Sequence, residues 1–175
     1  MNMIEAIGFA KRTNYLAIRL PYGSGNYNMT VLLPNDESLG VNGIISSLNT
    51  TEWNALQAGI IEQKVLVKLP KFGMEYEIKL NKILSEMGMP TAFTEKADLS
   101  KISPPAGKLV VGFVKQNTYV AVDEVGTEAA AVTTIGIELT SAPIIPEFVA
   151  DRPFLFVISE KQSNTILFLG KVAKL

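Results

Sequence analysis

The chain has 175 residues, of which 47% are hydrophobic, and its 16 basic and 17 acidic side chains give a net charge of −1. It contains no cysteine and no histidine, which excludes disulfides, thiol catalysis, thiolate metal sites, Ser-His-Asp triads and histidine-based acid–base chemistry. No basic field points to nucleic acid, and no apolar run reaches the roughly 18 residues of a membrane span. We therefore expect a globular protein of about one domain that is not an enzyme and holds no metal or cofactor.

A β-hairpin is predicted near the start of the chain. Residues 14–20 and 26–34 read as strands, and residues 21–26 join them with a proline and two glycines, which favour a tight turn. Residues 41–61 then show helical spacing in two pieces. Thr51 is the candidate N-cap of the second piece, with Asn49 as the alternative.

The middle of the chain continues with strands and short helices. Residues 62–80 form an amphipathic strand region that bends at Pro70 and Gly73. A short helix is predicted over residues 79–89. Residues 91–108 read as a loop with a weak helical turn near Asp98.

Two later regions are strongly apolar. Residues 109–124 read as a long strand whose first half is apolar on both faces, as in a buried central strand. Residues 153–159 and 165–172 read as a hairpin buried on both faces, joined by a polar turn. The chain as a whole is therefore strand-rich, of the α+β class.

The segment between these regions, residues 125–142, has no helix cap and is long for a loop without structure of its own. Read as a strand, it places small residues on one face: Thr127, Ala129, Ala131 and Thr133. The other face would carry Glu128, Ala130 and Val132. Such a small-residue face could enter a narrow gap without steric hindrance.

Other motifs have simpler interpretations. The glycines of residues 23–25 are read as a turn, because the lysine and helix of a phosphate-binding loop are missing. Asp123, Glu124 and Glu128 could form a carboxylate site, but strand-end charges are favoured. Residues 28–30 and 49–51 match the N-glycosylation pattern, which is common by chance.

Several stretches resemble the serpins, a family of serine protease inhibitors. Residues 124–133 (EVGTEAAAVT) resemble the serpin hinge signature, and residues 148–158 (FVADRPFLFVI) with 166–172 (ILFLGKV) resemble the C-terminal signature. Residues 66–103 resemble the strand, helix and loop that precede this C-terminal signature, and residues 20–34 resemble the family's central hairpin. The resemblance covers essentially the whole chain.

The resemblance implies a reactive centre loop at about 125–142 that a protease cleaves and that then inserts into the large sheet through a conformational change. The implied hinge comprises Glu124, Gly126, Thr127, Glu128, Ala129, Ala130 and Ala131. Family spacing from Glu124 places the reactive bond at Thr140–Ser141, with Leu139–Thr140 and Ser141–Ala142 as alternatives. No basic residue precedes these bonds, so the expected target is an elastase-like or subtilisin-like serine protease, with a cysteine protease as the alternative.

Serpins are about twice this length, so residues 1–175 are expected to form the C-terminal part of a single serpin domain with mostly antiparallel sheets and a few short helices. Alone, the chain is expected to be inactive and to associate with the missing N-terminal half or with another copy of itself. The resemblance implies an extracellular or periplasmic location, although no signal peptide is visible. The alternative is a non-inhibitory, serpin-like binding or structural protein.

Overall fold

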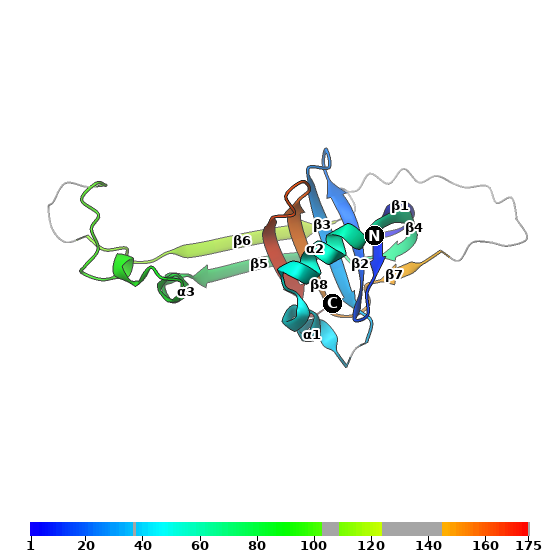
Figure 1. Ribbon diagram of the computed structural model, residues 1–175, viewed down its shortest axis with the longest axis horizontal. Helices are drawn as coiled ribbons and strands as arrows, with labels where there is room; N and C mark the ends of the chain where they lie inside the picture. Colours follow the sequence, from blue (N-terminus) through cyan, green and yellow to red (C-terminus); the bar gives the residue numbers. More distant parts are fainter. Residues whose placement is uncertain (37, 103–108, 124–144, 175) are drawn as a thin grey trace, which may run out of the picture. The chain divides into compact units, whose positions relative to one another are not determined.

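A computed structural model describes residues 1–36, 38–102, 109–123 and 145–174. The chain divides into two compact units, one made of residues 1–72 and 122–175 and the other of residues 73–121. A seven-stranded sheet belongs to the first unit and a two-stranded sheet to the second (Figure 1). In the described part of the chain, no helix is long and apolar enough to cross a membrane.

The seven-stranded sheet has the strand order β7-β4-β1-β2-β3-β8-β9. All neighbouring strands are antiparallel except β4 and β7, which are parallel. The expectation of a strand-rich α+β chain with mostly antiparallel sheets is therefore confirmed. The strands are β1 (Asn2–Lys11), β2 (Tyr15–Tyr22), β3 (Tyr27–Pro34), β4 (Ile61–Lys68), β7 (Glu147–Val149), β8 (Phe154–Glu160) and β9 (Ile166–Val172).

The predicted hairpin is confirmed as β2 and β3. Gly23 and Gly25 have φ angles of 50° and 81°, a region that glycine adopts without steric cost. The amide of Gly25 donates to the carbonyl of Tyr22 at 2.8 Å. These residues close a turn, as the sequence predicted, and no helix follows them.

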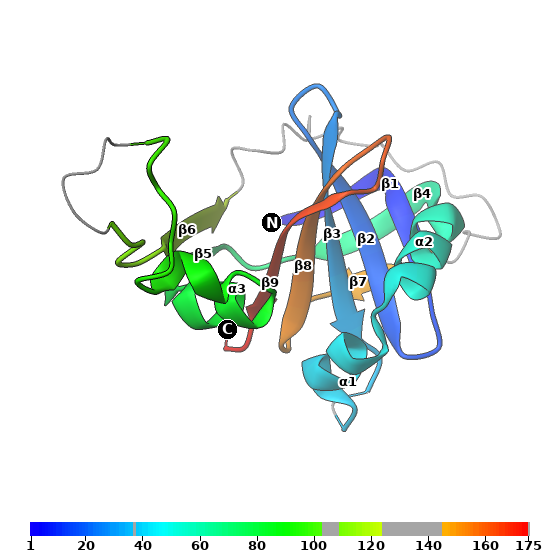
Figure 2. The same cartoon turned by 60° about the vertical axis from the view of Figure 1, so that its left-hand side comes forward.

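The two helical pieces predicted within residues 41–61 are confirmed, and both cover one face of the sheet. They are α1 (Gly40–Ser47) and α2 (Thr50–Gly59), and Figure 2 shows both on the same side of β2 and β3. Asn49, the alternative N-cap, caps α2 because its side chain accepts a hydrogen bond from the Glu52 amide at 2.9 Å. Ile44, Trp53 and Leu56 bury their side chains against the sheet.

The sheet fills its other face with its own side chains. A cross-strand row runs through Phe9, Ile18, Val31 and Phe156, each residue paired with the next, and all four are at most 8% exposed. In Figure 2, β4 and β7 run across the back of β2 and β3, and β7 contacts β2. The sheet therefore curls over this row and encloses it.

A polar cluster ties α2 to the start of β2. Tyr15 donates its hydroxyl proton to Glu52 Oε1 at 2.6 Å, and Arg12 Nε donates to the same oxygen at 3.2 Å. Tyr15 is only 2% exposed. Burial, together with the hydrogen bond to Glu52 and its charge, raises the pKa of Tyr15 to about 12.

Two features of the sheet differ from the sequence-based predictions. No element was assigned before residue 14, yet β1 is a central strand between β4 and β2. Ala6, Gly8 and Ala10 give it weak strand propensity, which pairing along both edges overrides. The hairpin of β8 and β9 is confirmed, but β9 is not buried: the side chains of Ile166 to Leu169 are 41–55% exposed, because β9 is an edge strand of this sheet.

The second unit contains a two-stranded sheet and two short helices. Its elements are β5 (Phe72–Lys79), β6 (Lys115–Val122), α3 (Asn81–Glu86) and the 3-10 helix η1 (Pro90–Phe93). The bend at Pro70 and Gly73 is confirmed, since β4 and β5 belong to different sheets. The helical turn expected near Asp98 is confirmed only as single turns: the Ala97 amide donates to the Thr94 carbonyl and the Ile102 amide to the Leu99 carbonyl, and the Asp98 carboxylate accepts from Ser100.

The long strand predicted over residues 109–124 is also wrong in part. Among the described residues 109–123, the strand is limited to Lys115–Val122, and Phe113 is 67% exposed. Residues before it bond to the short helices: the Val111 amide donates to the Ala92 carbonyl, and the Val114 amide donates to Asn81 Oδ1. None of the described residues between 73 and 121 is buried. The second unit therefore has no core of its own.

The close contact between β8 and β9 gives a testable prediction. A β-carbon at Gly170 would overlap the ring of Phe156, so Gly170→Ala should destabilise the protein by about 1–3 kcal/mol through overpacking. Gly59→Ala, where a β-carbon meets only one atom at 4.0 Å, should change the free energy of unfolding by less than about 0.5 kcal/mol. Urea unfolding, followed by the fluorescence of Trp53, the one tryptophan, measures the stability of both variants. Equal losses of stability would contradict the close packing of Phe156 on Gly170.

A second prediction concerns Tyr15 and pH. Between its ordinary pKa of about 10 and the folded pKa of about 12, the folded chain keeps a proton that the unfolded chain loses. Stability should therefore fall as pH rises through this window. Tyr15→Phe should remove that part of the fall, and Glu52→Gln should reduce it. Urea midpoints measured from pH 9 to 11.5 test this, and parallel curves for parent and Tyr15→Phe would contradict it.

Candidate functional site

The site residues predicted from the sequence lie outside the described part of the chain. These are the hinge residues Glu124, Gly126, Thr127, Glu128, Ala129, Ala130 and Ala131, and the reactive bond residues Thr140 and Ser141. Of the alternative carboxylate site, only Asp123 is described. What the structure does describe is the point where the chain leaves this segment, from Ile145 onward.

The downstream flank of the segment is held by the short strand β7. The Leu66 amide donates to the Pro146 carbonyl at 2.9 Å, and the Ala150 amide donates to the Lys68 carbonyl at 2.8 Å. Between these two bonds, Phe148 pairs with Val67, and both side chains are fully buried. The anchor therefore combines strand pairing along β4 with one aromatic side chain inserted into the core.

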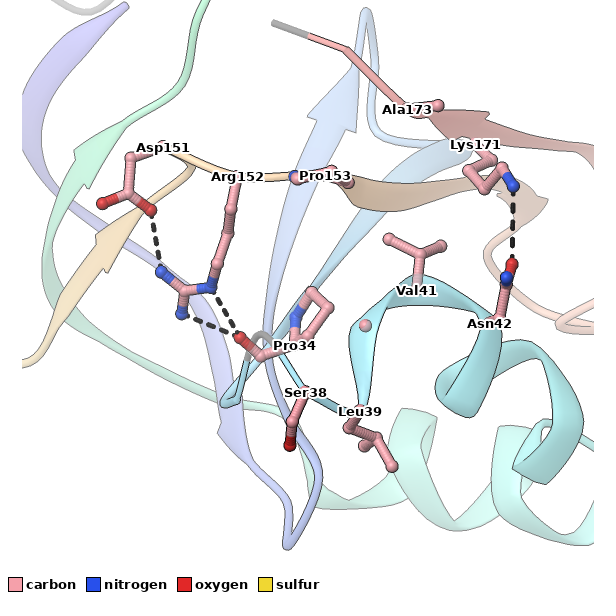
Figure 3. A pocket seen from close by; sticks show the side chains of 11 residues that line it. Pro34, Ser38, Leu39, Val41, Asn42, Asp151, Arg152, Pro153, Lys171 and Ala173 are labelled. Atoms are coloured by element: carbon pink, nitrogen blue, oxygen red, sulfur yellow. Dashed lines mark hydrogen bonds and ion pairs between the residues drawn. The ribbon is translucent and has the colours of Figure 1, made fainter.

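Arg152 fixes the connection from β7 to β8. Its guanidinium donates to the carbonyl of Pro34, at the end of β3, from Nε at 2.9 Å and from Nη2 at 2.7 Å (Figure 3). Nη1 donates to Asp151 Oδ1 at 2.7 Å. The Arg152 side chain is 24% exposed and that of Asp151 is 63% exposed. Hydrogen bonds from a charged donor are stronger than neutral ones, and partial burial protects them from solvent.

A cavity of about 650 Å³ lies beside this connection. It is lined by the end of β3, the start of α1, the β7–β8 connection and the end of β9 (Figure 3). Pro34, Val41 and Pro153 form its middle, and Lys171 Nζ donates to Asn42 Oδ1 at 3.4 Å on one side. Arg152 belongs to the other side, where its hydrogen bonds go to protein groups.

No arrangement of catalytic type is found among the residues that the structure describes. There, no three histidine, cysteine, aspartate or glutamate side chains gather as they would around a metal ion. The two glycosylation patterns have different settings: Asn28 is 6% exposed within β3, whereas Asn49 is exposed and caps α2. The described residues of this site therefore fix the backbone of residues 146–152 to the sheet, and they show no arrangement for chemistry.

Sequence reasoning missed Arg152. It was read only as part of the stretch 148–158 that resembles the C-terminal signature, and its hydrogen-bond acceptor is a backbone carbonyl far away in the sequence. Backbone acceptors leave no mark on composition or spacing. The only available signal is the Asp-Arg-Pro sequence itself, which places a charged side chain directly before a buried strand.

A curled, mostly antiparallel sheet with two helices on one face, joined in sequence to a two-stranded sheet, agrees with a serpin-like class of protein. The serpin family model, described as serine protease inhibitor, matches residues 1–175. Human Serpin B11 is 37% identical over 171 residues, which cover 95% of this chain and 43% of that protein. The chain belongs to the serpin family, and it spans less than half the length of the curated relatives it matches.

Solved serpin structures agree in fold. Native tengpin, a thermophilic serpin, is 34% identical with a TM-score of 0.79, and the match covers 100% of this chain and 46% of tengpin. Thyroxine-binding globulin in complex with thyroxine is 25% identical with a TM-score of 0.81, and the match covers 99% of this chain and 45% of that chain. The structure is therefore a partial serpin fold.

The anchoring role of Phe148 can be tested directly. Phe148→Ala should destabilise the protein by about 3–5 kcal/mol, because it removes a fully buried ring and leaves a cavity. The matched change Phe168→Ala, at a residue of β9 that is 43% exposed, should cost less than about 1 kcal/mol. Urea unfolding measures the stability of both variants. A Phe148→Ala variant that loses no more stability than Phe168→Ala would show that the Phe148 side chain does not anchor β7.

Proposed function

We propose that the protein to which this chain belongs is a serpin-type endopeptidase inhibitor. Residues 125–142, the reactive loop, serve as bait; a protease cuts it, forms an acyl-enzyme, and is trapped when the hinge inserts as a new strand. The observation that carries this proposal is the small-residue face of residues 127–133, made of Thr127, Ala129, Ala131 and Thr133. Small side chains enter a sheet with little steric resistance and little loss of side-chain entropy.

Two described features support insertion. Among the residues that the structure describes, β6 pairs with β5 alone, so its other edge is open to a further strand. The downstream end of the loop is held separately, in the seven-stranded sheet, through β7. With the downstream end fixed in this way, insertion as a new strand is assigned to the upstream part of the loop.

We further propose that residues 1–175 form the C-terminal part of one serpin domain and do not inhibit alone. Several apolar side chains of the second unit are exposed, among them Tyr76, Phe113 and Tyr119 at 58–69%. Exposed apolar surface of this kind favours association. We propose that the remaining part of the serpin domain covers this exposed surface, with a second copy of the chain as the alternative. Membership of the family favours an extracellular or periplasmic location.

A protease panel tests the function. With Thr140–Ser141 as the reactive bond, a form of the protein with a complete serpin domain should give SDS-stable complexes with elastase or subtilisin and not with trypsin. Ala129→Arg should convert the inhibitor into a substrate, because the charge enters the core. Ala130→Arg, on the opposite face, should trap like the parent. The ratio of complex to cleaved inhibitor on a denaturing gel decides, and an Ala129→Arg variant that traps fully would refute the hinge.

The second candidate is a non-inhibitory binding protein of the same fold. It is favoured by the similarity to thyroxine-binding globulin, which is solved with thyroxine bound. In that case every protease that cuts the loop should release cleaved chain without a covalent complex.

A further inference from the structure

The downstream anchor of the reactive loop is thin. β7 has only three residues, pairs with β4 alone in the described structure, and lies at the edge of the sheet. Short edge elements with few hydrogen bonds open locally at low free-energy cost. Strand pairing and Phe148 alone therefore leave this anchor among the easier parts of the first unit to open.

The strand that follows is, by contrast, firmly held. β8 lies between β3 and β9, and Phe154, Leu155, Phe156 and Val157 are at most 3% exposed. Only Ala150 to Pro153 connect the weak strand to the strong one. The contacts that residues 150–153 make therefore determine whether β7 is held in place by its connection to β8.

The fixing contact is the guanidinium of Arg152. Two of its nitrogens donate to one carbonyl, that of Pro34, and Tyr15 of β2 pairs with Pro34 across the sheet. The planar fork of arginine holds such an acceptor with less loss of freedom than a lysine would. Because Asp151 is mostly exposed, its ion pair contributes little, and the two bonds to Pro34 are the main restraint.

We infer that Arg152 is a positioning residue, the latch that keeps the downstream end of the reactive loop on the sheet. This rests on the proposed function for the identity of the loop, while the latch itself concerns described residues only. After cleavage, the upstream part of the loop must leave and the downstream part must stay behind. Arg152 makes the two ends unequal, since it ties residues 147–152 to β3.

Hydrogen exchange of single amides in the 175-residue chain tests the latch. The amides of Leu66 and Ala150 make the two hydrogen bonds that flank the three-residue pairing of β4 and β7. In Arg152→Gln, their exchange should become about tenfold faster, as expected for the loss of charge-assisted hydrogen bonds. Amides of β2 and β3 should keep the parent rate, which a general loss of stability would not allow.

Three further variants sharpen the result. Arg152→Lys keeps the charge but not the fork, so it should give an intermediate rate. Asp151→Asn should change the two amides by less than about threefold. Arg12→Gln is the matched control, because Arg12 also pairs with a carboxylate and is 30% exposed, yet it should leave Leu66 and Ala150 unchanged.

Unchanged exchange of Leu66 and Ala150 in Arg152→Gln overturns the latch, and so does faster exchange throughout β2 and β3. In a form with a complete serpin domain, Arg152→Gln should form the protease complex several-fold more slowly. Ala129→Arg should lose trapping yet keep parent exchange at Leu66 and Ala150. If the parent traps no protease, the proposed function fails, while the exchange result still decides the latch.

Discussion

The structure depends on one packing constraint: the curled sheet must fill its inner face with its own side chains. Phe156 occupies that face and presses on Gly170 of the neighbouring strand, where any side chain would collide with it. The ring of Phe72 meets Phe156 at 5.5 Å and Phe154 at 5.4 Å between centroids. Since β4 and β7 complete the curl, the same packing also positions the strand that receives the segment 124–144.

The strands of the first unit differ in how firmly they are held. β3 and β8 lie inside the sheet and are almost completely buried, whereas β7 is a three-residue edge strand. Residues 147–152, which follow the segment 124–144, contact the rest of the first unit through one aromatic and one arginine side chain, Phe148 and Arg152.

Much of the fold could be predicted from the sequence, because the alternation of Val65, Val67 and Leu69 and the helical spacing of residues 41–61 report burial on one face. β1 could not, because its small residues Ala6 and Gly8 carry little propensity and it is stabilised by pairing on both edges. Residues 109–114 and β9 were misjudged for the opposite reason. Apolar composition indicates that a segment tends to be buried, but it does not show that other parts of the described chain bury it.

The candidate site was predictable only in its composition. The small residues of the proposed hinge are visible in the sequence, since side-chain volume is a property of each residue alone. The hydrogen bonds of Arg152 are not, because Pro34 accepts them through its backbone, and any residue could offer a carbonyl there. Sequence identifies what a segment is made of, while the fold determines what holds it.

The parallel pairing of β4 and β7 has a consequence for folding. Every other pair in the seven-stranded sheet is antiparallel, but β7 reaches β4 only after the whole second unit and the segment 124–144 have been traversed. Contacts of such long sequence separation carry a large loop-closure entropy and form slowly. During synthesis β7 emerges only after β1 to β6, so its pairing with β4 is expected to form late in folding.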